Sequence, residues 1–187
     1  MDTDVRNSTL PAPSPQVLID QLCEHLTRTA GGDASLLCDF AREFVGKATR
    51  QLVHERTLED RAALTVAAFH FLQRALPERV NVEVVEPEDE GWSAPVTVLR
   101  ANLADRPFIV DTIREYLSAE GLVIHRFIHP VLGVERGEGG QVLRVGELDV
   151  GSPEALVHCE ISRLQEPQRR DAVRAAVAGR LGDVGSG

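Results

Sequence analysis

Apolar residues recur at helical spacing along three stretches in the first part of the chain, and each stretch follows a residue that can cap a helix. The capping residues are Ser14, Asp33 and Thr57. Gly31 and Pro77 follow the first and third stretches and are typical helix stop signals. The pattern predicts three helices with short links, which form a small bundle or a layer packed on the remainder of the chain. The apolar positions are Leu18, Ile19, Leu22, Cys23 and Leu26; Leu36, Leu37, Phe40, Ala41, Phe44, Ala48 and Leu52; and Leu64, Ala67, Ala68, Phe71, Leu72 and Ala75.

After Pro77 the pattern changes to short, β-branched, alternating runs. From Val96 the predicted order is strand, helix, strand, hairpin extension, strand and helix. This is the order of a ferredoxin-like split βαβ fold, α+β in class, that lacks only its last strand. The two helices would cover one side of a mainly antiparallel sheet. The predicted strands span 80–85, 96–103, 122–135, 141–145 and 155–162, and the predicted helices span 107–120 and 167–181.

The absent last strand allows two interpretations. Either the chain is a fragment of a longer one, or the strand Val80–Val85 occupies the vacant edge of the sheet. Because an unpaired edge exposes backbone hydrogen-bonding groups, we expect a homo-oligomer or a contact with a further region. The predicted organisation is a flexible lead-in over 1–14, a helical subdomain over 15–78, and an α+β domain over 79–187 whose last strand is missing or truncated.

Composition narrows the classes of partner. The formal net charge is -9 and the pI is about 5.1, which disfavours binding to the phosphate backbone of nucleic acid. No run reaches the roughly 18 apolar residues of a membrane span, and the N-terminus lacks the apolar stretch of a signal peptide. Three cysteines without a C-x-x-C pair fit a reducing compartment. We therefore expect a cytoplasmic protein with no nucleic acid and no membrane as partners.

The acidic segment 86–95 separates the first two predicted strands. Its carboxylates could suggest a calcium site, but their spacing is not that of an EF-hand loop, and no other ligands converge there. The sequence therefore predicts a solvated connection at this point.

A candidate ligand site lies at the predicted strand-to-helix turn, where Asp105, Arg106 and Pro107 precede Phe108 and Ile109. Asp105 is predicted to cap the helix, which would stabilise the turn by about 1 kcal/mol. The positive end of the helix could hold a carboxylate, such as that of an amino acid, and Arg106 could add a bidentate contact. The alternative is a structural cap beside a surface arginine.

Two pairs of residues are weak candidates for a metal site. His125 and His129 are four apart on one predicted strand and share a face, with Cα atoms about 13 Å apart, so they cannot bind one metal together. His158 and Glu160 share a face of a later strand and could meet one of those histidines, and such a set can bind iron or zinc. The alternative is that hydrogen bonds within an apolar sheet satisfy the histidines.

Three segments, "DRPFIVDTI", "GLVIHRFIHPVLGVER" and "EALVHCEISR", resemble in order and spacing the N-terminal ACT-like region of the large bacterial NAD-dependent glutamate dehydrogenases. ACT domains are small regulatory modules that often bind amino acids at dimer interfaces. Phe108 stands where their usual signature has glycine, and its side chain could fill the space of a ligand. The matching residues are Asp105, Pro107, Phe108, Val110 and Asp111; Ile128, His129, Pro130 and Val131; and His158, Glu160 and Ile161.

The resemblance implies a parent enzyme that converts L-glutamate to 2-oxoglutarate and ammonia with NAD, in a catalytic region much further along a longer polypeptide. This chain has a single lysine, Lys47, and no G-x-G-x-x-G motif, so we expect no catalytic residue and no cofactor in it. The implied role is regulatory or architectural, with the rest of the polypeptide, further copies of the chain or an amino-acid effector as partners. The candidate ligand-binding residues are Asp105, Arg106, Pro107, Phe108, Ile109, His125 and His129.

Two alternatives remain open. The chain could be an amino-acid sensor of the ACT type, free-standing or fused, in which Asp105, Arg106 and the backbone near Phe108 hold the ligand. It could also be a metal-dependent enzyme that uses His158 and Glu160 with a histidine of the earlier strand.

Overall fold

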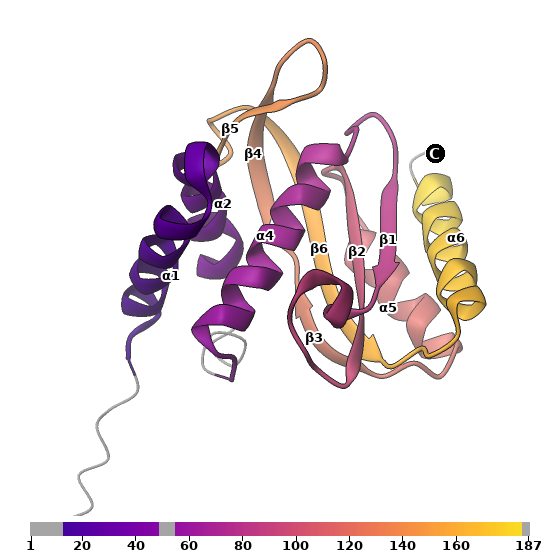
Figure 1. Ribbon diagram of the computed structural model, residues 1–187. Helices are drawn as coiled ribbons and strands as arrows, with labels where there is room; N and C mark the ends of the chain where they lie inside the picture. The colour runs from indigo at the N-terminus through magenta and orange to yellow at the C-terminus, as the bar shows by residue number, and fades with distance from the viewer. Residues whose placement is uncertain (1–12, 49–54, 185–187) are drawn as a thin grey trace, which may run out of the picture.

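A sheet between two layers of helices forms the computed structural model, which describes residues 13–48 and 55–184 (Figure 1). Three N-terminal helices lie on one face of the sheet and two later helices cover the other. The predicted α+β class, the N-terminal helical layer and the placement of the two later helices on one side are confirmed. The helices are α1 (Pro15–Thr29), α2 (Ala34–Gly46), α4 (Leu58–Arg74), α5 (Ile109–Ala119) and α6 (Pro167–Val184).

Local capping explains where two of the N-terminal helices begin. The Ser14 hydroxyl accepts a hydrogen bond from the amide of Val17 at the start of α1, and Thr57 accepts one from Asp60 at the start of α4. Both predicted caps are therefore confirmed. Asp33 makes no side-chain capping hydrogen bond, because α2 continues from a short 3-10 turn over Gly31–Asp33. The predicted extension of α2 to Leu52 falls partly outside the described residues.

The sheet has six strands in the order β1-β2-β6-β4-β5, and β3 pairs with β6 beside β4. Every pairing in the described part of the chain is antiparallel. The strands are β1 (Asn81–Val85), β2 (Val96–Ala104), β3 (Ile124–Ile128), β4 (Val131–Arg136), β5 (Val142–Gly146) and β6 (Ser152–Ser162).

Strand β1 occupies the sheet position that the missing last strand of a ferredoxin-like fold would take. It pairs antiparallel with β2, with Val82 opposite Ala101 and Val84 opposite Leu99. The segment before the βαβ unit therefore completes the sheet at this edge, whether or not the chain is part of a longer one.

The single long strand predicted over 122–135 is wrong, because the chain forms two strands that separate at His129 and Pro130. Proline has no N–H to give to a strand ladder, so the regular pairing stops there. The Pro130 carbonyl still accepts a hydrogen bond from the amide of Leu156, and both β3 and β4 pair with β6. The break removes the alternation that had placed His125 and His129 on one face.

Alternating side chains of β2 and β6 fill two separate hydrophobic cores. Leu99, Ala101 and Val157 pack under α5 and α6. Val98 and Leu156 point the other way and pack with the three N-terminal helices. The helical segment and the sheet therefore share one core, while the division into 15–78 and 79–187 stays a prediction.

The acidic connection between β1 and β2 is folded and partly buried, so its prediction as a solvated loop is wrong. Pro87–Glu90 form a 3-10 turn that ends at Gly91 with φ 82°. Glu86 and Trp92 are buried, because Glu86 bonds to Thr97 and Trp92 joins the core under the N-terminal helices. Among the helices in the described residues, none is long and apolar enough to cross a membrane.

Candidate functional site

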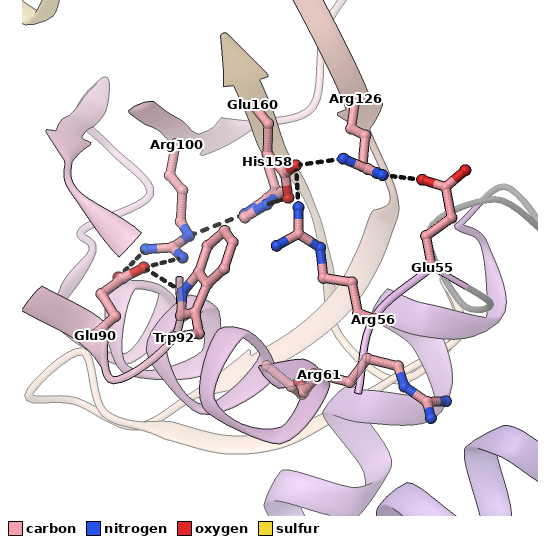
Figure 2. Close-up of polar contacts among 10 residues, drawn as sticks. Glu55, Arg56, Arg61, Glu90, Trp92, Arg100, Arg126, His158 and Glu160 are labelled. Atoms are coloured by element: carbon pink, nitrogen blue, oxygen red, sulfur yellow. Dashed lines mark hydrogen bonds and ion pairs between the residues drawn. The ribbon is translucent and has the colours of Figure 1, made fainter. Parts of the chain in front are cut away.

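A chain of charged side chains lies between the sheet and the N-terminal helical layer (Figure 2). It follows from the alternation in the central strands, because Arg100 of β2 and His158 and Glu160 of β6 sit on the face turned to those helices. All three side chains are fully buried. We call this set the buried charge network, which comprises Glu55, Arg56, Glu83, Glu90, Arg100, Arg126, His158 and Glu160.

Arg100 anchors one end of the buried charge network. Its Nη1 donates to Glu83 Oε1 at 2.8 Å and to Glu90 Oε2 at 2.5 Å, and its Nη2 donates to Glu90 Oε1 at 2.8 Å. Burial acts to lower the pKa of the Arg100 guanidinium, but the hydrogen bonds and charges of Glu90 and Glu83 outweigh it and raise that pKa. Arg100 is therefore a permanent buried cation with two carboxylate partners.

The hydrogen bond between Arg100 and His158 fixes the protonation state of the imidazole. Arg100 Nε can only donate, and it lies 3.2 Å from His158 Nδ1. Nδ1 must therefore accept, so the ring proton sits on Nε2, which lies 3.4 Å from Glu160 Oε1. Burial likewise lowers the pKa of His158, although Glu160 acts in the opposite direction. His158 is thus neutral, with both ring nitrogens engaged.

Glu160 joins three elements at the other end of the network. Its Oε2 accepts from Arg56 Nη2 at 2.5 Å and from Arg126 Nη1 at 3.2 Å, and Arg126 also pairs with Glu55. Burial alone would raise the pKa of Glu160, but the hydrogen bond from His158 and the charges of Arg56 and Arg126 hold it below its ordinary value. The carboxylate therefore stays ionised in the interior.

Aromatic side chains pack against the inner part of the network. The Arg56 guanidinium lies 4.4 Å from the centroid of the Trp92 ring, in a cation–π contact. The indole nitrogen of Trp92 donates to Glu90 Oε1 at 3.3 Å, and the ring of Phe44 meets His158 edge-on with centroids 5.9 Å apart. These contacts tie the segment before α4, the acidic turn and helix α2 to one side of the sheet.

The imidazole of His158 is not available as a general base. A general base needs a free imidazole nitrogen, but Arg100 and Glu160 occupy both nitrogens of His158. A groove of about 570 Å³ between α1, α4 and the acidic turn reaches Glu90 but is not lined by His158 or Glu160. Removal of one partner of such a buried pair would leave an unpaired charge in the interior.

The predicted proximity of His158 and Glu160 is confirmed, but no histidine of the earlier strand joins them. Arginines surround the pair instead, and their positive charge disfavours a cation. In residues 13–48 and 55–184 no group of three or more His, Cys, Asp or Glu side chains could hold a metal ion. The structure therefore does not support the metal-site hypothesis.

A second buried cluster fixes the far end of the sheet. Arg136 pairs with Glu154 through Nε at 2.7 Å and Nη2 at 2.9 Å, and Asn102 donates to the same carboxylate at 3.1 Å. Arg136 also donates to the carbonyl oxygens of Leu72 in α4 and Gly140 in the hairpin turn. This cluster likewise connects the helical layer to the sheet.

The predicted turn exists, but Asp105 does not cap the helix. Helix α5 begins at Ile109, and Phe108 at the capping position makes no side-chain hydrogen bond to it. The backbone amide of Asp105 donates to the carbonyl of Pro153 in the neighbouring strand β6. Arg106 Nη2 donates to the carbonyl of Leu181 in the last turn of α6, so this arginine ties two elements together. The cap prediction failed because Asp105 lies too many residues before the first helical turn.

Phe108 is the one described residue other than glycine with a positive φ, at 70°. This left-handed conformation explains why the related signature has glycine here. The phenyl ring is 67% exposed, so it does not fill a ligand space within this chain. Pro107 is also exposed in the turn, whereas Ile109 is buried in the core and is not available to a ligand.

The two histidines of the broken strand lie in different surroundings. His125 is exposed. His129 is partly buried, its Nε2 has no hydrogen-bond partner, and burial lowers its pKa against the opposing charge of nearby Asp105. The structure thus brings His129 near the turn.

The sequence did not single out Arg56, Arg100, Glu83 or Glu90. A signal for Arg100 was present, because it is the one charged residue in the mainly apolar strand "VTVLRANLA". No comparable local signal marks Arg56, since its partner Glu160 is 104 residues away in the chain.

The fold and the site define an ACT-like α+β domain with an N-terminal helical layer fixed to its sheet by a buried charge network. The chain belongs to the family described as glutamate dehydrogenase, ACT1 domain, which matches residues 40–177. The resemblance noted from the sequence is therefore confirmed.

Two curated relatives extend this likeness over nearly the whole chain. The NAD-specific glutamate dehydrogenase of Halomonas elongata is 29% identical over 174 residues, which cover 89% of this chain and 11% of that protein. The NAD-specific glutamate dehydrogenase of Pseudomonas aeruginosa is 31% identical over 170 residues, covering 87% of this chain and 10% of that protein. The chain thus spans about a tenth of the length of these relatives. No solved structure matches it.

Proposed function

We propose that this chain is a non-catalytic regulatory or assembly module of a large NAD-specific glutamate dehydrogenase. The observation that carries the proposal is the family match over 40–177, combined with relatives of which the chain covers only about a tenth. The reaction, L-glutamate with NAD to 2-oxoglutarate, ammonia and NADH, would take place elsewhere in such an enzyme. NAD would bind in that other part of the enzyme. The module would lie in the cytoplasm and contact the rest of the polypeptide or further copies of it.

The buried charge network supports this role over a catalytic one. Its charges are compensated inside the fold, and the imidazole at its centre has no free nitrogen. Such a network serves to hold a helical layer rigidly on a sheet, which suits a module that transmits or supports an arrangement of domains.

The first test is the activity of the purified chain. With L-glutamate and NAD supplied, we expect no NADH above the rate without protein, while the Pseudomonas aeruginosa enzyme in the same assay reduces NAD. Glutamate-dependent NADH formation by the chain alone would overturn the non-catalytic assignment.

A second candidate function is amino-acid sensing at the turn before α5. The specific observation in its favour is His129, which lies close enough to Asp105 to feel its charge. The buried Nε2 of His129 has no hydrogen-bond partner. A thermal-shift screen of the standard amino acids tests it, because a ligand at a hundredfold excess over its Kd raises the stability by about 2.7 kcal/mol. The shift should disappear in Asp105→Asn, and a screen without any shift removes this candidate.

A further inference from the structure

Strand β1 lies at one edge of the sheet, beside α6 (Figure 1). A groove of about 440 Å³ at this strand is lined by residues of α4, of the segment 79–83 and of α6. The lining includes Arg74, Arg79, Val82, Glu83, Arg174 and Ala178.

The groove is positively charged, although the chain carries a formal net charge of -9. Arg79 and Arg174 are exposed, and neither guanidinium forms an ion pair within the described residues. Arg74 pairs with Glu83 at 3.0 Å, and Glu83 also pairs with the buried Arg100 at 2.8 Å. The single carboxylate in the lining is therefore already neutralised, and two arginines remain for an external anion.

Within the described residues β1 pairs only with β2, so its other edge has no strand partner, and α6 packs against the strand. All five residues of β1 are half-buried. An edge of this kind offers backbone N–H and C=O groups to an added strand. Val82 faces the core under α6, while Glu83 faces Arg74 and Arg100 on the other side of the sheet. An added strand would thus present alternate side chains to the two walls.

We propose that this groove binds an extended acidic peptide segment, which adds to β1 as a further strand. Main-chain hydrogen bonds to β1 would give affinity. Neighbouring carboxylates would point to opposite sides of the added strand, one to Arg174 of α6 and the next to Arg79, which gives specificity for consecutive acidic residues. The inference goes beyond the proposed function and does not depend on it, because only the groove carries it.

Fluorescence anisotropy with a short labelled peptide of glutamate and valine tests the proposal on the 187-residue chain. The double variant Arg79→Glu with Arg174→Glu should weaken binding about tenfold or more, since two attractive charge pairs become repulsive. The matched control, Arg28→Glu with Arg144→Glu, makes the same change of net charge at exposed sites away from the groove and should shift the Kd less than about twofold.

A second peptide separates strand addition from simple charge attraction. Methylation of alternate backbone nitrogens of the same peptide removes its hydrogen bonds and should abolish binding, and free glutarate should not compete. Binding that survives methylation or the double substitution overturns the proposal. An absence of binding by the unmodified peptide, or glutarate displacing it completely, overturns it as well.

Discussion

Arg100 Nε donates a hydrogen bond to His158 Nδ1 over 3.2 Å, at a depth where neither side chain reaches solvent. This contact decides the state of the imidazole, because a guanidinium only donates hydrogen bonds, so Nδ1 must accept and cannot carry a proton. Arg100 and His158 lie 58 residues apart in the chain and meet because β2 pairs with β6, while Glu83 and Glu90 compensate the charge of the arginine.

Removal of the Glu160 charge should destabilise the fold. In Glu160→Gln, Arg56 would stay buried without its counter-ion, and a broken buried pair costs about 3 kcal/mol. Urea unfolding followed by circular dichroism measures the loss. The control Glu135→Gln breaks the exposed pair with Arg144 and should cost under about 1 kcal/mol. Equal losses of unfolding free energy in the two variants would mean that the buried pair stabilises the fold no more than the exposed pair.

The stability of the chain should fall as the pH drops below about 6.5. The pKa of His158 is lowered from its ordinary value of 6.5 in the folded state. Below that pH the unfolded state binds a proton that the folded state does not bind, which favours unfolding. The pKa of His129 is also lowered, so its protonation likewise reduces the stability of the fold as the pH falls. The lowered pKa of Glu160 adds a further loss as the pH falls through its ordinary value of 4.5.

Substitution of His158 isolates its share of this pH dependence. The amide of His158→Gln can replace both hydrogen bonds without titrating, so the slope of unfolding free energy against pH between about 6.5 and 5 should become shallower. His125→Gln changes an exposed histidine and is the matched control. An unchanged slope in His158→Gln would show that the ring is not held neutral.

Phe108→Gly should stabilise the protein slightly. A left-handed conformation costs a non-glycine residue about 1–2 kcal/mol, whereas glycine loses roughly 0.5–1 kcal/mol through the entropy of the unfolded chain. The exposed ring gives up little burial, so a net gain of about 0.5 kcal/mol is expected in thermal unfolding. Phe108→Ala keeps the unfavourable backbone and should show no gain. A clear loss of stability in the glycine variant would mean that the Phe108 ring makes a stabilising contact.

Two glycine substitutions should have opposite signs. A Cβ at Gly133 would overlap the backbone carbonyl of Glu147, so Gly133→Ala should cost about 1–3 kcal/mol. A Cβ at Gly179 in α6 meets no atom within 4 Å, so Gly179→Ala should gain up to about 1 kcal/mol from helix propensity. Chemical denaturation of both variants checks the packing of the β4 region, and a tolerated alanine at position 133 would contradict it.

Local signals predicted the elements well, and tertiary contacts decided what the sequence missed. Ser14 and Thr57 were identified because a cap acts within a few residues. Asp105 was wrongly predicted to cap α5, because the sequence does not reveal the turn that separates it from Ile109. The pairing of Arg100 with His158 depends on strand register, which local pattern alone does not fix.

The mass of an assembled dehydrogenase tests the central claim most directly. The segment of the Pseudomonas aeruginosa enzyme that matches this chain would be deleted in one variant and replaced by this chain in another. Sedimentation velocity, with glutamate-dependent NAD reduction as a parallel readout, compares both with the parent. We expect deletion to alter the oligomeric mass or the response of activity to amino acids, and the replacement to restore it. A deletion variant with the mass, activity and amino-acid response of the parent would contradict a regulatory or assembly role.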